Sequence, residues 1–156
     1  MLRPEKHTPQ TLVRGLREGV PAFSAVLDAV IQATYVCSQT FHSGVKPGFP
    51  KTINTNDPGV LKAARYSVER FNNCTNDIFL FKESHVSRAL VQIVKGLKYM
   101  LDMEIGRTTC KKTKHPSLDN CDFQTNHTLK MILSCYSEVW VIPWLRRFEV
   151  PVLHCH

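Results

Sequence analysis

The sequence predicts an α+β domain in which one long helix precedes a meander of antiparallel strands. Two observations support this prediction. A helix-start signal at Asp57-Pro58 is followed by apolar residues at helical spacing, and the chain beyond it divides into segments with alternating apolar and polar residues. Because the helix and the strands are segregated along the chain, we expect the helix to cover one face of a single sheet. The 156 residues are enough for one domain.

The helix is expected from Pro58 to Asn73. The Asp57 side chain can cap the free amides of the first turn, and proline fits the first helical position. The apolar residues of the segment fall near one helical face, which we expect to pack against the sheet: Val60, Leu61, Ala64, Val68 and Phe71.

Strands are expected after the helix at Ile78 to Val94, Lys98 to Lys111, Thr128 to Ile142 and Arg146 to Cys155. The glycine between the first two strands supplies the positive φ that a tight hairpin needs. The tip of this first hairpin is therefore predicted at Gln92-Ile93-Val94-Lys95-Gly96. Pro143-Trp144 separates the last two strands, which predicts that Trp144 lies at a second loop tip. Trp140 lies in an alternating segment, and we expect it in the core.

An extended arm is expected from Ser38 to Thr55, where Pro47, Gly48 and Pro50 limit the backbone. Residues 1–36 are expected to be a leader or extension outside the domain, which is placed at residues 37–156. Their polar start departs from the pattern of a signal peptide, so an alternative start or an amphipathic extension is the competing interpretation. No segment is long and apolar enough to predict a membrane span.

The charge pattern gives no indication of nucleic-acid binding. The net charge is +7, but the basic residues are scattered apart from two short clusters, at residues 111–114 and 146–147. A nucleic-acid surface needs a basic stripe, usually with stacking aromatic residues. We therefore expect a solvated basic surface that is at most weakly attracted to acidic partners.

Six cysteines indicate disulfide bonds, although the sequence leaves many pairings open. The chain has no Cys-x-x-Cys pair and no histidines at ligand spacing, so we expect neither a metal nor a cofactor. Two N-glycosylation sequons begin at Asn73 and Asn126. Sequons together with disulfides favour the secretory pathway.

Three pieces of sequence occur in an order that resembles the type 2, secreted cystatins, which inhibit papain-like cysteine proteases. They are Gly48, the Gln92–Gly96 segment and Pro143-Trp144, and residues 106–110 and 119–121 extend the similarity. The resemblance implies a cystatin-like fold, with an antiparallel sheet wrapped around one long helix. It also implies that the three pieces form a wedge that enters the cleft of cathepsins and blocks it reversibly.

The resemblance further implies disulfides among Cys110, Cys121, Cys135 and Cys155, with the first pair closing a loop and the second joining the last two strands. The arm is long enough for Cys37 to bond Cys74 within one chain or in a neighbour. The resemblance favours reciprocal bridges between Cys37 and Cys74 of two chains, which would close a disulfide-linked homodimer that is latent until reduced. It implies a second site at Asn76 for legumain, an asparaginyl endopeptidase. The expected location is secreted and endolysosomal.

Two other functions compete with protease inhibition. An enzyme would use a cysteine nucleophile with a histidine base, but the sequence around a papain-like catalytic cysteine is absent, so we expect no enzymatic activity. The second alternative is a disulfide-linked binding module that has the cystatin fold but does not inhibit proteases.

Overall fold

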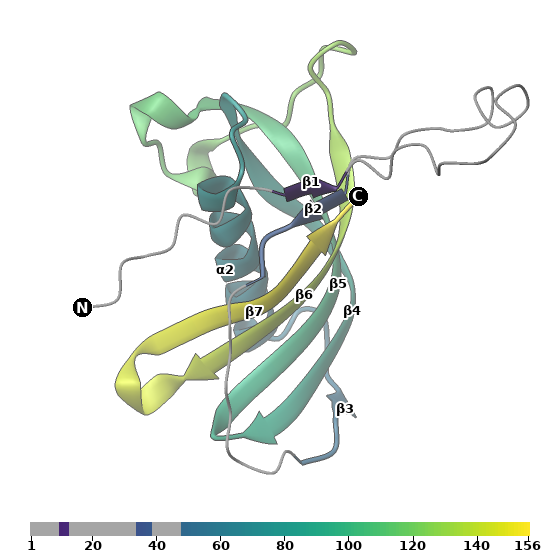
Figure 1. The fold of residues 1–156 in the computed structure, drawn as a ribbon, viewed down its shortest axis with the longest axis vertical. Coiled ribbons are helices and arrows are strands. Elements are labelled where there is room, and N and C mark those ends of the chain that lie inside the picture. Colours follow the sequence, from purple (N-terminus) through teal and green to yellow (C-terminus); the bar gives the residue numbers. More distant parts are fainter. Residues whose placement is uncertain (1–9, 13–33, 39–47) are drawn as a thin grey trace, which may run out of the picture.

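A computed structural model of the protein describes residues 10–12, 34–38 and 48–156. These residues form a seven-stranded antiparallel sheet with the order β1-β2-β7-β6-β5-β4-β3. The sheet curves around helix α2, which crosses one of its faces (Figure 1). This arrangement confirms the predicted fold class, an antiparallel sheet wrapped around one long helix.

The elements that follow the arm agree closely with the prediction. They are α2 (Pro58–Cys74), β4 (Phe79–Val94), β5 (Gly96–Lys111), β6 (Ile132–Ile142) and β7 (Arg147–Cys155). Short 3₁₀ turns, η1 (Lys112–Lys114), η2 (Leu118–Asn120) and η3 (Pro143–Leu145), lie in the connections. The third strand begins later than expected because Asn126 Oδ1 accepts hydrogen bonds from the backbone N–H and the hydroxyl of Thr128, which makes a local turn.

Helix α2 begins as the sequence predicts and packs through a slightly different face. Asp57 Oδ1 accepts the Gly59 N–H at 2.8 Å, which caps the first turn. The buried face includes Val60, Ala64, Val68 and Phe71, together with the small residues Ala63 and Ser67. Leu61 was expected on this face and is 50% exposed. It lies one position away from Val60, so the helical rotation turns it out of the stripe that contacts the sheet.

Two polar contacts hold the helix at a short distance from the sheet. The Ser67 and Ser137 hydroxyl oxygens lie 2.6 Å apart in the core, which joins α2 to β6. The Asn72 side chain donates to Phe81 O at 2.9 Å and accepts the Phe81 N–H at 2.8 Å, which joins α2 to β4. The buried side chains of Ser67, Asn72 and Ser137 thus each have a hydrogen-bond partner.

The sheet extends further towards the N-terminus than predicted. Strand β2 (Thr34–Val36) pairs with β7, and β1 (Gln10–Leu12) pairs with β2. The sheet therefore begins before the predicted domain boundary at Cys37 and continues to that residue, whose N–H donates to Leu153 O at 2.9 Å. Most of the expected leader or extension, residues 1–9 and 13–33, lies outside the described residues, as do residues 39–47 of the arm. In the described part of the chain, no helix has the length and hydrophobicity needed to cross a membrane.

Candidate functional site

The first hairpin joins the two longest strands of the sheet. Lys95 stands between β4 and β5, and Gly96 adopts a φ of 95° as the hairpin prediction requires. Ile93 is 67% exposed at the tip and Lys95 is also exposed, whereas Gln92 and Val94 are half-buried. The tip thus presents an apolar side chain to solvent from a backbone that is paired as far as Val94 and Gly96.

Gly48 of the arm is bonded to this hairpin tip. The Gly48 N–H donates to Ile93 O at 2.9 Å, and the Gln92 side-chain amide donates to Gly48 O at 2.6 Å. A Cβ atom on Gly48 would lie 3.2 Å from Ile93 O, so the absence of a side chain permits this close approach. The next arm segment, β3 (Lys51–Thr52), pairs with β4. The described part of the arm therefore has a defined place beside the hairpin.

The second hairpin lies against the first. It joins β6 to β7 through the η3 turn, in which Trp144 is 63% exposed, as predicted for a loop tip. A Cβ on Gly96 would collide with the carbonyl oxygen of Val141 and would lie 3.3 Å from Ile142 Cα. Gly96 therefore serves both its own turn and the contact between the hairpins.

Trp140 corrects one expectation from the sequence. It is half-buried instead of a core residue, and its indole Nε1–H donates to Lys95 O at 2.6 Å. The inward positions of β6 are Cys135, Ser137 and Val139, so strand alternation directs Trp140 to the outer face of the sheet. There it joins the strand of the second hairpin to the turn of the first.

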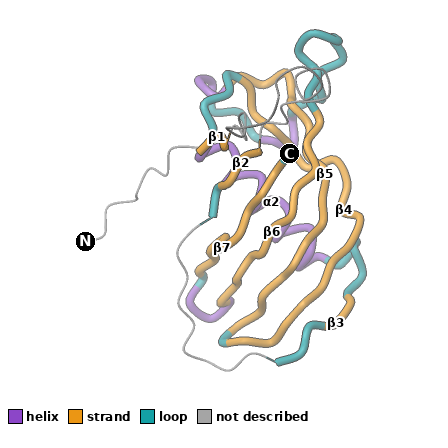
Figure 2. The backbone as a smooth tube through the Cα atoms, turned by 45° about the vertical axis from the view of Figure 1, so that its right-hand side comes forward, coloured by secondary structure: helices purple, strands orange, loops and turns teal. Residues whose placement is uncertain are grey.

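These contacts place three separate segments at one edge of the molecule, which we call the hairpin edge: Gly48 and Phe49, Gln92 to Gly96, and Pro143 to Leu145. Figure 2 shows the two hairpin turns and the segment before β3 at the same end of the sheet. The exposed apolar residues of the hairpin edge are Phe49, Ile93, Trp144 and Leu145, with exposed fractions of 92%, 67%, 63% and 49%. Phe49 and Leu145 were not predicted as site residues, although each directly follows a predicted one, Gly48 and Trp144.

Asn76 lies at the opposite end of the sheet, because it precedes β4 whereas the hairpin edge follows that strand. Asn76 is exposed in the connection between α2 and β4. On one side, Thr75 O accepts a hydrogen bond from Lys112 Nζ at 2.5 Å. On the other, Asp77 Oδ2 and Arg107 Nη2 form an ion pair at 2.5 Å. The two predicted sites are therefore separate in space.

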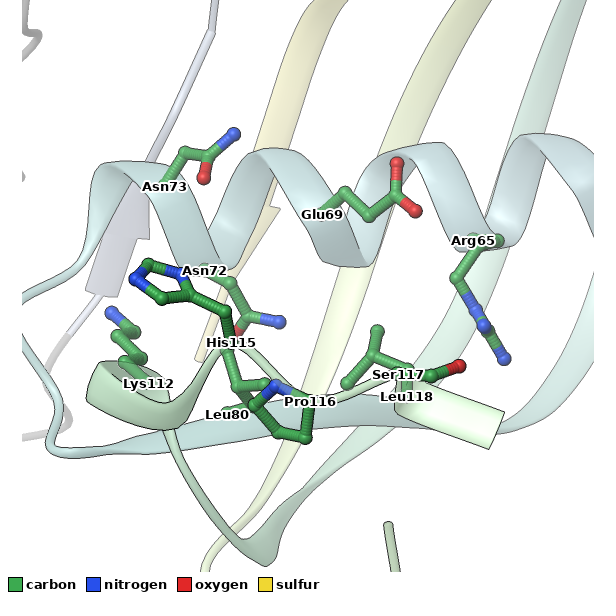
Figure 3. Close-up of a pocket in the computed structure, with 10 residues that line it drawn as sticks. All are labelled: Arg65, Glu69, Asn72, Asn73, Leu80, Lys112, His115, Pro116, Ser117 and Leu118. Carbon is green, nitrogen blue, oxygen red and sulfur yellow. The ribbon is translucent and has the colours of Figure 1, made fainter. Parts of the chain in front are cut away.

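A cleft of about 560 Å³ lies beside the Asn76 connection, between α2 and the turns that follow β5. Figure 3 shows Asn73 and Glu69 of the helix along one side of this cleft and Lys112, His115 and Pro116 along the other. Burial lowers the pKa of Lys112, an effect that the nearby Asp77 carboxylate opposes. The cleft has charges of both signs, so it does not form a single-sign electrostatic site.

All six cysteines form disulfides. Cys110–Cys121 and Cys135–Cys155 have Cα separations of 5.7 Å and 4.1 Å, and the first closes the loop after β5 whereas the second joins β6 to β7. These bonds leave no thiol to act as a nucleophile. In addition, residues 10–12, 34–38 and 48–156 contain no cluster of side chains that could hold a metal ion.

The remaining pair is Cys37 and Cys74, for which the sequence favours a bridge between two chains. Cys37 and Cys74 are joined within one chain, with a Cα separation of 6.0 Å, and both are buried. The physical reason is that β2 docks on β7 and Arg70 Nε donates to Cys37 O at 3.1 Å, which brings Cys37 against the end of α2.

Comparison with known proteins identifies the family. Residues 48–144 match the cystatin domain, and the chain therefore belongs to the cystatin family, which comprises inhibitors of cysteine proteases and not enzymes. The chain is 80% identical to cystatin-F from Homo sapiens over 120 residues, which cover 77% of this chain and 83% of that protein. It is 78% identical to cystatin-F from Mus musculus over 119 residues, which cover 76% and 83%.

Among solved structures, the crystal structure of dimeric human cystatin F is similar with a TM-score of 0.70. Its sequence identity is 80%, and the match covers 77% of this chain and 95% of that chain. These findings confirm the resemblance that the sequence pieces around Gly48, Gly96 and Trp144 predicted.

Proposed function

We propose that the protein is a reversible, tight-binding inhibitor of papain-like cysteine proteases of the cathepsin type, and that the hairpin edge is the wedge that blocks their cleft. The observation that supports this most is that three segments distant in sequence are bonded into one preformed apolar edge. Gln92 joins the arm to the first hairpin, and Trp140 joins the first hairpin to the second.

A preformed edge suits an inhibitor because little conformational entropy remains to be lost on binding. The exposed indole of Trp144 supplies a large, stiff anchor, which is the kind of side chain that dominates interface energies. Ile93 and Phe49 add apolar area from the other two segments. Gly48 and Gly96 let the backbones approach each other closely.

The test is an inhibition assay against cathepsin L with a matched pair of variants. Ile93 at the hairpin edge and Ile78 at the other end of β4 are 67% and 68% exposed. Ile93→Ala should weaken inhibition about 5- to 30-fold, and Ile78→Ala should leave it unchanged. Equal effects of the two variants would refute the wedge. A folded wild-type chain that does not inhibit even after reduction would favour the alternative, a disulfide-linked cystatin-fold module that binds other partners.

A second site against legumain is proposed at Asn76. The motivation is an exposed asparagine in a short connection whose flanking residues are held by Lys112 and Arg107. Asn76→Ala should abolish legumain inhibition and leave cathepsin L inhibition intact, since Asn76 lies away from the hairpin edge. If both activities fell together in a folded variant, the two-site proposal would be wrong.

A disulfide-linked homodimer is proposed as a latent form. The human relative was crystallised as a dimer. In this chain, β2 and Cys37 dock on β7 and α2, and an exchanged arm from a second copy can make the same contacts across a two-fold axis. Non-reducing electrophoresis beside a cathepsin L assay tests this. Wild type should run as a dimer that inhibits only after reduction, and Cys37→Ser should run as an active monomer. A monomeric oxidised wild type would exclude the dimer.

Secretion and endolysosomal location are proposed from the same features. Disulfides persist in oxidising compartments, and the sequon residues Asn73 and Asn126 are both exposed. Protein recovered from the medium of expressing cells should lose mass on treatment with a glycosidase that removes N-linked glycans. Asn73→Gln and Asn126→Gln should each remove one glycan, and a full-length variant without either should show no shift.

A further inference from the structure

The Asn76 connection is held at both ends by side chains from outside it. On the N-terminal side, the Thr75 backbone N–H and hydroxyl both donate to Phe71 O, at 3.0 Å and 2.8 Å. Thr75 O then accepts from Lys112 Nζ at 2.5 Å. Thr75 is buried and Asn76 is exposed, so the chain emerges into solvent directly after a fixed residue.

The C-terminal side is held by a different group. Asp77 Oδ1 accepts the Phe79 N–H at 2.9 Å, and Asp77 Oδ2 pairs with Arg107 Nη2 at 2.5 Å. The Arg107 guanidinium is itself fixed, since Nη1 donates to Leu129 O at 2.7 Å and the group lies 5.6 Å from the centre of the Phe81 ring. Both oxygen atoms of the Asp77 carboxylate therefore have a hydrogen-bond or ion-pair partner.

The two holding residues come from one stretch of the chain. Arg107 lies near the end of β5 and Lys112 begins η1, directly after it. The Lys112 backbone N–H also donates to Ile78 O at 3.0 Å, which fixes this turn against the start of β4. The Cys110–Cys121 bond closes the loop that follows β5 and contains η1. The two residues that support the Asn76 connection are therefore themselves bonded to β4 and to the disulfide-closed loop.

We infer that Lys112 and Arg107 are positioning residues that fix the peptide units on either side of Asn76, so that the side chain is presented in one conformation to an asparagine-specific endopeptidase. This inference rests on the second site proposed above. A loop that is already ordered loses less conformational entropy on binding, so release of either end should weaken inhibition. Neither residue belongs to the hairpin edge, so inhibition of papain-like proteases should not change.

The principal test uses Lys112→Gln with a matched control. Lys114 lies in the same η1 turn, is exposed, and has the same charge, so Lys114→Gln makes the same charge change without breaking the contact with Thr75. Lys112→Gln should weaken legumain inhibition about 10- to 100-fold, as expected for loss of a half-buried charged hydrogen bond. Lys114→Gln should match wild type, and Lys112→Arg should restore most of the inhibition.

Two further measurements separate positioning from a general loss of structure. Cathepsin L inhibition by Lys112→Gln should remain within error of wild type, and its urea midpoint should fall by no more than the loss of one half-buried hydrogen bond accounts for. Hydrogen exchange at the Thr75 amide, which donates to Phe71 O, should become faster. Arg107→Gln should weaken legumain inhibition in the same way from the other side of the connection. Unchanged exchange in Lys112→Gln, or a general loss of folding that abolishes both inhibitory activities, would overturn the positioning role.

Asn76→Ala separates a failure of the legumain site from a failure of the positioning role of Lys112. If Asn76→Ala abolishes legumain inhibition and Lys112→Gln leaves it intact, the second site stands and the positioning inference is wrong. If wild type does not inhibit legumain, or Asn76→Ala inhibits as well as wild type, the second site itself fails and the positioning inference fails with it.

Discussion

The Gln92 side-chain amide donates a hydrogen bond to the carbonyl oxygen of Gly48 at 2.6 Å, across 44 residues of sequence. Gly48 returns a backbone hydrogen bond to Ile93 O at 2.9 Å. These two bonds fix the start of the described arm on the tip of the first hairpin, so Gln92 acts on the arm as well as on its own strand.

Replacement of Gln92 by methionine should therefore loosen the arm. Methionine has a similar length and no donor, so the change removes the bond to Gly48 with little change in volume. We expect about 3- to 10-fold weaker inhibition of cathepsin L, which corresponds to loss of one ordinary hydrogen bond. The urea midpoint should be unchanged, because the bond lies at the surface. Wild-type inhibition by the variant would show that the bond does not position the arm.

Gly96→Ala should destabilise the protein more than Gly48→Ala does. At Gly96 the new Cβ meets the Val141 carbonyl oxygen, and the φ of 95° is unfavourable for any residue with a side chain. At Gly48 the nearest atom is Ile93 O at 3.2 Å. We expect a loss of about 2 to 4 kcal/mol for Gly96→Ala and under about 1 kcal/mol for Gly48→Ala. Equilibrium unfolding in urea measures both, and equal losses would contradict the close approach of the hairpins.

Trp144→Ala should weaken inhibition of papain-like proteases and leave the fold intact. Truncation of an exposed aromatic anchor costs about 2 to 4 kcal/mol of binding energy, or about 30- to 1,000-fold in affinity. The side chain is 63% exposed, so its removal leaves no core cavity. Inhibition constants for cathepsin L, with the urea midpoint as the control for folding, check this. Unchanged affinity would remove Trp144 from the wedge.

Replacement of both Cys37 and Cys74 by serine should lower the stability of the monomer. The bond closes a loop with a sequence separation of 37 residues, and the chain-entropy estimate for such a loop is about 3 to 4 kcal/mol. If wild type is monomeric when oxidised, the difference between its free energy of unfolding and that of the double variant measures this loss. A double variant as stable as the oxidised monomer would show that the bond within one chain adds nothing to the folded state.

Stability should also fall at high pH through Tyr136. Burial, followed by the charge of Glu138, raises the pKa of Tyr136 from 10.0 to about 12. The folded state holds the Tyr136 proton more tightly than the unfolded state does. The resulting contribution of Tyr136 to the free energy of unfolding is therefore fully present below about pH 10 and is lost as the pH rises towards about 12. The urea midpoint of Tyr136→Phe should therefore fall less over this interval than that of wild type. Parallel curves for the two proteins would contradict the shift.

The local features of the fold could be predicted from the sequence because they depend on neighbouring residues. The cap at Asp57, the positive φ at Gly96 and the exposed Trp144 all follow from residue type and short-range pattern. The outward direction of Trp140 could also have been predicted. Trp140 lies five positions after the inward-facing Cys135, and an odd spacing along a strand places two side chains on opposite faces of the sheet.

The tertiary contacts of the site could not be predicted in this way. The partner of Gln92 depends on where the arm returns to the sheet, and no periodic pattern encodes that distance. The same holds for Cys37, because docking of β2 on β7 brings it to Cys74 of its own chain. A second chain that docks in the same way presents the same local geometry, so the sequence alone does not distinguish the two pairings.

The three segments of the hairpin edge are proposed to bind a protease together. Hydrogen exchange of the active monomer, free and in complex with cathepsin L whose active-site thiol is blocked, tests this most directly. We predict slower exchange in the complex at residues 48–50, 92–96 and 143–146, with no change at residues 75–78. Protection confined to one of the three segments, or centred on residues 75–78, would contradict the account.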